Sequence, residues 1–175
     1  MKQPAATIAA HLAAAHDKGS IASYWAAGVC LVAIAFSFCY EVVSRYFFNA
    51  PTAWASPLVS YNLIAMIFLA LPEITRRAEH IYVNLLIDAL SPRYARRLES
   101  FVRILAASTC LFAAWFSANE TLQQFTQEVW TVPPLAVPKW TVSIWIPYGM
   151  LGAATHFLRQ LLAGTAGART RQGGL

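Results

Sequence analysis

The chain has 175 residues, of which 58% are hydrophobic and only 12% carry a charge. Ordinary soluble domains contain roughly 25% charged residues, so this composition excludes a typical water-soluble protein and indicates that lipid is the solvent. The net charge of +5 would suggest nucleic-acid binding in a soluble protein. Here the basic residues lie between long apolar stretches, which is typical of a membrane surface, and no nucleic-acid partner is predicted.

Residues 1–20 are predicted to form a cytoplasmic leader rather than a secretory signal. The histidines at positions 11 and 16 interrupt its apolar residues, and no A-x-A cleavage motif follows the next long apolar stretch. At the other end, residues 164–175 are rich in glycine and arginine, and we expect a flexible cytoplasmic tail. The residues between these two ends, 21–163, are the predicted membrane domain.

Four apolar stretches are long enough to cross a bilayer as helices. A helix rises about 1.5 Å per residue and therefore needs about 20 apolar residues to cross roughly 30 Å of hydrocarbon. None of the four shows the alternating pattern of a barrel strand. The sequence thus predicts an all-α membrane protein with four transmembrane helices, at about residues 21–44, 57–75, 100–123 and 140–160.

A shorter segment between the second and third spans, residues 80–90, is predicted to form an amphipathic arm helix. It is too short to cross the bilayer. Helical spacing would place on one face Val83, Leu86, Ile87 and Leu90. The polar stripe would hold His80, Asn84 and Asp88. Such a helix lies in the interface between water and lipid, although the first six residues also alternate as in a strand.

Lysine and arginine residues are concentrated on one side of the predicted spans. Eleven of the 13 lie before the first span, between the second and third, or after the fourth, and the two exceptions are Arg45 and Lys139. Because segments rich in these residues stay on the cytoplasmic side, both termini and residues 76–103 are predicted to be cytoplasmic. Residues 45–56 and about 121–139 are then periplasmic.

The predicted spans contain few polar side chains that could carry chemistry. Glu41 and Arg45 are four residues apart and are expected to pair, and Asn62 is expected to hydrogen-bond to a neighbouring helix. No nucleophile–base set, phosphate-binding loop or metal-ligand spacing is present, so no catalytic, cofactor-binding or metal-binding residue is predicted. The sequence therefore disfavours an enzyme or a self-contained transporter, because solute transport needs polar groups inside the membrane.

Two histidines leave one alternative open. His80 and His156 both fall near the predicted cytoplasmic face, and histidines inside a helix bundle can be the axial ligands of haem. The alternative function is therefore a haem- or quinone-binding membrane anchor of a respiratory complex. Both histidines lie close to the ends of predicted elements, which disfavours this alternative.

Small and aromatic side chains indicate surfaces for helix packing. Along the third span, a stripe with a spacing of four contains Ala106, Cys110, Ala114 and Ala118. Small residues let helix backbones approach each other closely. Tryptophans gather toward the predicted outer face, at positions 54, 130, 140 and 145, as in an aromatic belt. Such features anchor a protein in lipid or bind a larger membrane partner.

Three segments carry a more specific pattern. Residues 45–54 read RYFFNAPTAW, residues 76–86 read RRAEHIYVNLL, and residues 132–149 read VPPLAVPKWTVSIWIPYG. The first resembles the R-Y-x-F-N-x-P-x-x-W pattern that ends the first span in the small membrane subunit of TRAP transporters, the DctQ-type family. The others are similar to that family's basic end of the second span and to its proline-rich outer loop. The family commonly carries acidic residues at the start of its second span. This chain has Ala55, Ser56 and Pro57 there instead.

The resemblance implies a small permease subunit of a sodium-coupled, binding-protein-dependent secondary transporter for organic acids, in the bacterial inner membrane. Its partners would be membrane lipid, a periplasmic substrate-binding protein and the large TRAP membrane subunit, which binds sodium and the organic acid. The chain itself would bind no cofactor and would act as scaffold and anchor. Which acid is transported depends on the partner chains. The residues predicted to contact a partner are Arg45, Tyr46, Asn49, Trp54, His80, Ala106, Cys110, Ala114 and Trp140.

Overall fold

The computed structural model describes residues 4–77 and 92–172. Over this part of the chain all regular elements are helices, which confirms the predicted all-α class. The five described helices are α1 (Pro4–Phe47), α2 (Ala55–Arg77), α4 (Pro92–Thr126), α5 (Lys139–Ser143) and α6 (Trp145–Gln172). The arm predicted at residues 80–90, with its His80, lies outside the described residues.

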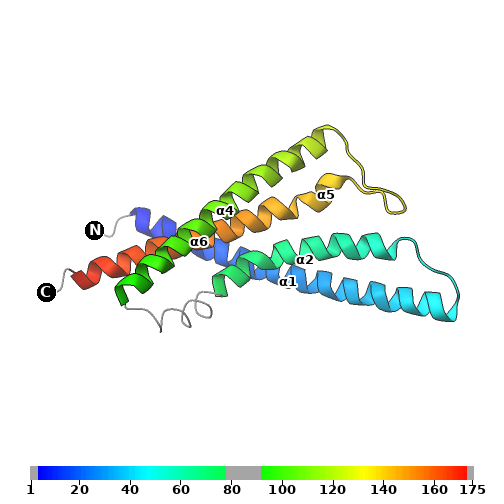
Figure 1. Cartoon of the computed structure of the whole chain (residues 1–175), viewed down its shortest axis with the longest axis horizontal. Coiled ribbons are helices and arrows are strands. Elements are labelled where there is room, and N and C mark those ends of the chain that lie inside the picture. Colours follow the sequence, from blue (N-terminus) through cyan, green and yellow to red (C-terminus); the bar gives the residue numbers. More distant parts are fainter. Residues whose placement is uncertain (1–3, 78–91, 173–175) are drawn as a thin grey trace.

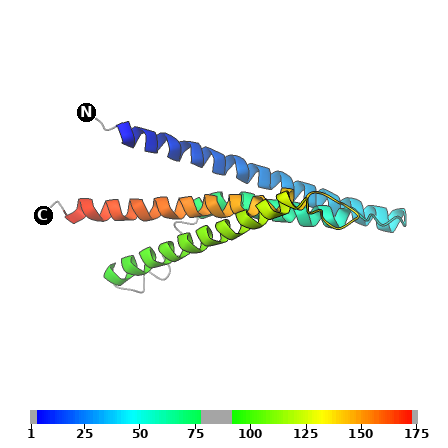
Figure 2. The same ribbon diagram turned by 90° about the horizontal axis from the view of Figure 1, so that it is seen from above.

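The long helices form two hairpins that pack side by side (Figure 1). α1 packs on α2, α2 packs on α6, and α6 packs on α4, so α1 and α4 are the outer helices of the described bundle. Both chain ends lie at one end of the bundle, the terminal end, and segments 48–54 and 127–138 lie at the other, the loop end (Figure 1). Toward the terminal end, α1 and α4 diverge from α6 (Figure 2).

Three of the described helices are long and apolar enough to cross a membrane. They are Ala13–Phe47 in α1, Ala55–Arg77 in α2 and Ser100–Thr126 in α4. Their outward faces carry large hydrophobic side chains that a water-soluble protein would mostly bury. Trp25 is 73% exposed and Trp115 is 69% exposed. Three of the four predicted spans are therefore confirmed in length and composition.

The fourth predicted span, residues 140–160, stays a prediction. α6 contains His156, Arg159 and Gln160, which lower its hydropathy. It is not among the described helices that are apolar enough to cross a membrane. It nevertheless runs antiparallel to α4 (Figure 1). A short break separates it from α5, because Pro147 has no backbone N–H and fits best in the first turn of a new helix.

The described helices extend beyond the predicted spans. α1 continues as one helix from Pro4 through the predicted leader, and α6 continues to Gln172 through most of the predicted tail. The boundaries predicted at residues 20/21 and 163/164 therefore do not coincide with helix ends. Hydropathy detects the part of a helix that suits lipid, whereas the backbone hydrogen bonds of the helix can continue into water.

α2 and α6 approach each other closely at two glycines of α6. A Cβ atom on Gly149 would lie 2.4 Å from the carbonyl oxygen of Phe68, and one on Gly152 would lie 2.6 Å from Cγ of Pro72. Real Cβ atoms essentially never approach other atoms this closely, so neither position has room for a side chain. Small residues thus bring the two helix backbones into contact. This contact is the α2–α6 seam.

Candidate functional site

Six side chains from α1 and α6 form a polar cluster toward the terminal end. They are His16, Asp17 and Ser20 of α1, and Thr155, His156 and Arg159 of α6. The guanidinium of Arg159 donates to both carboxylate oxygens of Asp17, at 2.5 and 3.2 Å. The two imidazole rings lie 4.5 Å apart between their centroids. Because positions 16, 17 and 20 share a helix face, as do 155, 156 and 159, the two polar faces meet.

Two hydroxyl groups determine the hydrogen bonds of both histidines. Ser20 Oγ donates to the carbonyl oxygen of His16 at 3.1 Å, and Thr155 Oγ1 donates to that of Gly152 at 2.8 Å. Each hydroxyl has only one proton. Nε2 of His156 therefore donates to Ser20 at 3.0 Å, and Nε2 of His16 donates to Thr155 at 2.9 Å. Nδ1 of His16 is left buried, without a hydrogen-bond partner among the described residues.

The cluster also contains donor atoms that could bind a metal ion. One such atom from each of His16, Asp17 and His156 lies within 4.8 Å of the others. Asp17, however, already binds the guanidinium of Arg159 through both oxygens, and this cation would repel a metal ion. We therefore assign the cluster a structural role, in which it ties the terminal end of α1 to α6.

The predicted leader hides this cluster from sequence analysis, because it separates residues 1–20 from the first span. A signal is nevertheless present in the sequence. Small residues recur every three or four positions along α1, at Ser20, Ser23 and Ala27. The structure buries all three on one helix face. The same spacing leads back from Ser20 to His16. The apolar helix could thus have been extended toward the N-terminus from this periodicity.

A buried carboxylate fixes the basic end of α2. Glu73 is 0% exposed and accepts two hydrogen bonds from Arg76, at 2.7 and 2.6 Å, and one from Arg77 at 2.7 Å. The guanidinium of Arg77 also lies 5.4 Å from the ring centre of Tyr24 in α1. Removing one partner from a buried ion pair leaves an uncompensated charge, so the three groups depend on one another. Two arginines of the predicted cytoplasmic segment therefore belong to the packed end of α2.

At the loop end, Glu41 organises the corner between α1 and α2. It accepts a hydrogen bond from Nη2 of Arg45 at 2.6 Å, which confirms the predicted pair. It also accepts hydrogen bonds from the backbone N–H of Thr52, at 3.2 Å, and from the Thr52 hydroxyl. A single carboxylate thus joins the last turn of α1 to the segment that enters α2.

Other residues of segment 45–54 contribute to the same corner. Asn49 has a φ of 50°, a left-handed conformation that asparagine adopts more readily than most residues. The ring of Trp54 lies 5.5 Å from the ring of Tyr40. Tyr46 is 79% exposed. The predicted partner residues of this segment therefore include both corner-forming side chains and an exposed ring.

The predicted partner residues on α4 and α5 are partly covered by the chain itself. Ala114 is 2% exposed, and Ala106 and Cys110 are half-buried, so this stripe packs within the bundle. The main neighbour of α4 is α6. Trp140 is half-buried and contacts Phe125 edge to face, with 5.5 Å between ring centres. Small residues on α4 thus provide the close approach to α6.

Two expectations about polar residues change. Asn62 donates to the carbonyl oxygen of Leu58 at 2.9 Å, and no bond from it to a neighbouring helix is found among the described residues. An asparagine side chain can bond to its own preceding turn, and here this bond satisfies it locally. His156 is 3% exposed and bonded to Ser20, and His80 lies outside the described residues. The haem alternative is therefore not supported.

Long apolar helices with exposed hydrophobic faces define a multi-pass membrane protein. The family model of the DctQ component of tripartite ATP-independent periplasmic transporters matches residues 24–167. The match covers most of the chain, from α1 to α6, and the chain belongs to this family. The family is a component of a transporter and not an enzyme. No curated protein was found that matches the sequence.

Proposed function

We propose that the chain is the small permease subunit of a sodium-coupled, binding-protein-dependent transporter for organic acids. In this role it is the scaffold and membrane anchor of the large transport subunit, in the bacterial inner membrane. The family match over residues 24–167 carries the proposal. Sodium and the organic acid would bind to the large subunit, a periplasmic binding protein would deliver the acid, and this chain would bind no cofactor.

Polar side chains within the three apolar helices support a scaffold more than a solute pathway. Ser37, Asn62 and Ser117 each donate a hydrogen bond to the carbonyl oxygen four residues earlier in their own helix. A transport site must replace the water around an ion with polar groups that point at the ion. Each of these three side chains makes a hydrogen bond within its own helix, which favours a structural role for it.

The outward face of α4 offers a surface for lipid and for a partner helix. Its aromatic side chains are well exposed: Phe112 is 66% exposed, Trp115 69% and Phe116 58%. In a membrane, helices associate through van der Waals packing rather than through the hydrophobic effect, so exposed apolar faces suit lipid and protein equally. This face therefore supports the anchor and scaffold roles together.

We also propose that α5 and α6 make a fourth crossing, with both termini in the cytoplasm. Lys139 and Arg159 are 20 residues apart, which corresponds to roughly 30 Å of helix and matches the hydrocarbon thickness. An even number of crossings returns the chain to its starting side, and both termini lie at the terminal end (Figure 1). Arg76 and Arg77 lie at the same end, and the positive-inside rule makes it cytoplasmic.

Cysteine labelling tests this orientation. In a chain whose native cysteines are replaced by alanine, Val132→Cys should react with a membrane-impermeant maleimide added to spheroplasts, whereas Arg97→Cys should not. Val132 is 80% exposed in a loop-end segment, and Arg97 is exposed near the start of α4. Permeabilised cells provide the control, because both positions should then react. Labelling of position 97 but not of position 132 in intact spheroplasts would show the opposite orientation.

Co-purification tests the proposed partnership. The tagged chain should retain the large subunit of its transporter in equal amounts after extraction in mild detergent. Trp54→Ala, at the corner packed on Tyr40, should reduce retention several-fold. Trp130→Ala is the matched control, since Trp130 is 60% exposed in a loop-end segment and is not a predicted partner residue. Failure of the unaltered chain to retain any large subunit would contradict the proposal.

A further inference from the structure

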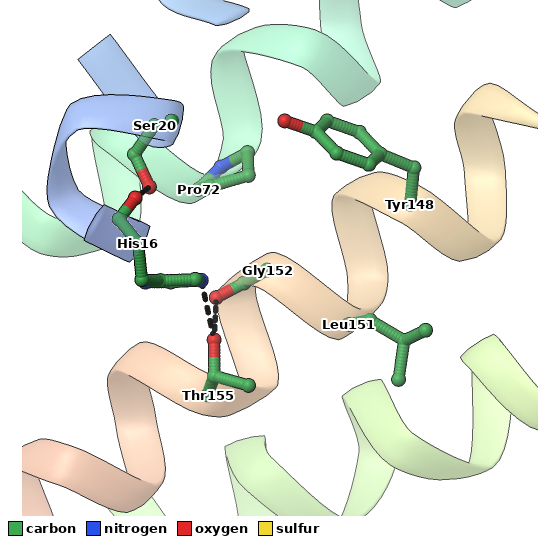
Figure 3. A pocket seen from close by; sticks show the side chains of 8 residues that line it. His16, Ser20, Pro72, Tyr148, Leu151, Gly152 and Thr155 are labelled. Atoms are coloured by element: carbon green, nitrogen blue, oxygen red, sulfur yellow. Dashed lines mark hydrogen bonds between the residues drawn. The ribbon is translucent and has the colours of Figure 1, made fainter. Parts of the chain in front are cut away.

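Three helices enclose a cleft next to the polar cluster. α1 contributes Gly19, α2 contributes Pro72, and α6 contributes Tyr148 and Leu151. The cleft has a volume of about 370 Å³, within the range of roughly 300–1,000 Å³ that is common for ligand sites. Most of its wall is apolar. Figure 3 shows Tyr148 and Leu151 toward one end, and His16, Ser20 and Thr155 of the polar cluster toward the other.

The cleft remains open between His16 and Ser20 because α1 has no side chain at Gly19. A Cβ atom on Gly19 would meet no heavy atom within 4 Å. α1 also diverges from α6 toward the terminal end (Figure 2). Gly19 lies within the apolar stretch Ala13–Phe47, so the cleft lies beside membrane-spanning helices. An apolar space of this kind does not hold ordered water. In a membrane, the acyl chains of lipids surround such helices and are the apolar groups that can fill it.

The polar end of the cleft lies in a basic environment. Exposed Lys18 is the direct neighbour of Gly19, and Arg159 lies on the facing helix. The charged side chains toward this end include the cations Lys18, Arg76, Arg77, Arg103 and Arg159 and the carboxylates Asp17 and Glu73. The cations in this set outnumber the carboxylates. Basic pockets between membrane helices bind anionic lipid headgroups, because the charges attract the phosphate.

We propose that this cleft binds one anionic phospholipid, with an acyl chain along Gly19, Pro72 and Leu151 and the phosphate beside His16 and Lys18. His16 lines the cleft and carries the buried nitrogen that has no partner among the described residues. The ammonium group of exposed Lys18 would donate charge-assisted hydrogen bonds to the phosphate. A bound lipid would complete the contact between α1 and α6 where the two helices diverge.

This site does not depend on the proposed transport role, since any membrane-embedded form of the chain would have it. His16, Gly19 and Ser20 precede the matched residues 24–167, so the family match does not imply the site. The proposed orientation decides only which leaflet supplies the lipid. With the terminal end in the cytoplasm, it is the inner leaflet.

Native mass spectrometry tests the site. The full chain is measured in mild detergent with added phosphatidylglycerol or phosphatidylcholine. We expect one bound phosphatidylglycerol per chain and a preference of about tenfold over phosphatidylcholine. Gly19→Leu should lower the bound fraction about tenfold, because the new side chain fills the cleft without meeting other atoms. Leu151→Trp, which fills the cleft from α6, should have the same effect.

Gly28→Leu is the matched control. Gly28 also lies on α1, a Cβ atom there meets nothing within 4 Å, and the residue does not line the cleft. Its lipid binding should equal that of the unaltered chain. Equal binding of the two lipids, or equal loss in the Gly19 and Gly28 variants, would overturn the proposal. So would complete loss of the lipid when the large subunit is bound, because the cleft would then be a subunit contact.

Discussion

Gly149→Ala should destabilise the bundle by roughly 2–3 kcal/mol, the upper part of the range for overpacking of a close contact. The added Cβ atom would lie 2.4 Å from the carbonyl oxygen of Phe68 and 2.9 Å from its Cα atom. Both are backbone atoms, so no rotation of a side chain can relieve the overlap. α2 and α6 must instead move apart, and α6 is also the helix on which α4 packs.

Gly28→Ala provides a control with the opposite sign. The substitution is chemically identical and also lies in a long apolar helix, but its Cβ atom would meet no heavy atom within 4 Å. Replacing glycine by alanine inside a helix favours the helix by roughly 0.5–1 kcal/mol. Thermal unfolding in detergent should therefore show a lower midpoint for Gly149→Ala and an equal or higher midpoint for Gly28→Ala. Equal midpoints in the two variants would mean that the α2–α6 seam is not a close contact.

Hydropathy and charge predicted the parts of the fold that depend on lipid. Three spans are confirmed because long runs of apolar residues have no other stable environment, and the Glu41–Arg45 pair is confirmed because both residues lie on one helix. Local spacing was sufficient in each case. The fourth span stays a prediction, since His156 and Arg159 reduce the hydropathy of α6.

Contacts between distant segments could not be predicted in the same way. The polar cluster joins residues 16–20 to residues 155–159, and only the placement of α1 beside α6 brings them together. The role of Gly149 likewise depends on which helix faces it, although its place in the segment 132–149 was recognised. Asn62 shows a further effect: a polar residue in a span suggests a partner helix, but a carbonyl oxygen of its own helix accepts its hydrogen bond here.

The scaffold role makes a clear prediction for transport. Sodium-driven uptake by vesicles that contain the large subunit and the binding protein should fall to background when this chain is omitted. Asn62→Ala should keep both assembly and sodium dependence, because the scaffold role places the sodium ligands on the large subunit and the Asn62 amide donates within its own helix. Gly149→Ala should reduce uptake together with assembly, because it disturbs the packing of the scaffold.

Uptake in these vesicles tests the scaffold role most directly. It is measured with and without a sodium gradient, and the amount of assembled complex is determined for each variant. We expect uptake per assembled complex to be the same for Asn62→Ala as for the unaltered chain. Full uptake in vesicles that lack this chain would contradict the scaffold role. Normal assembly of Asn62→Ala with loss of sodium dependence would contradict it as well, since this chain would then form part of the ion site.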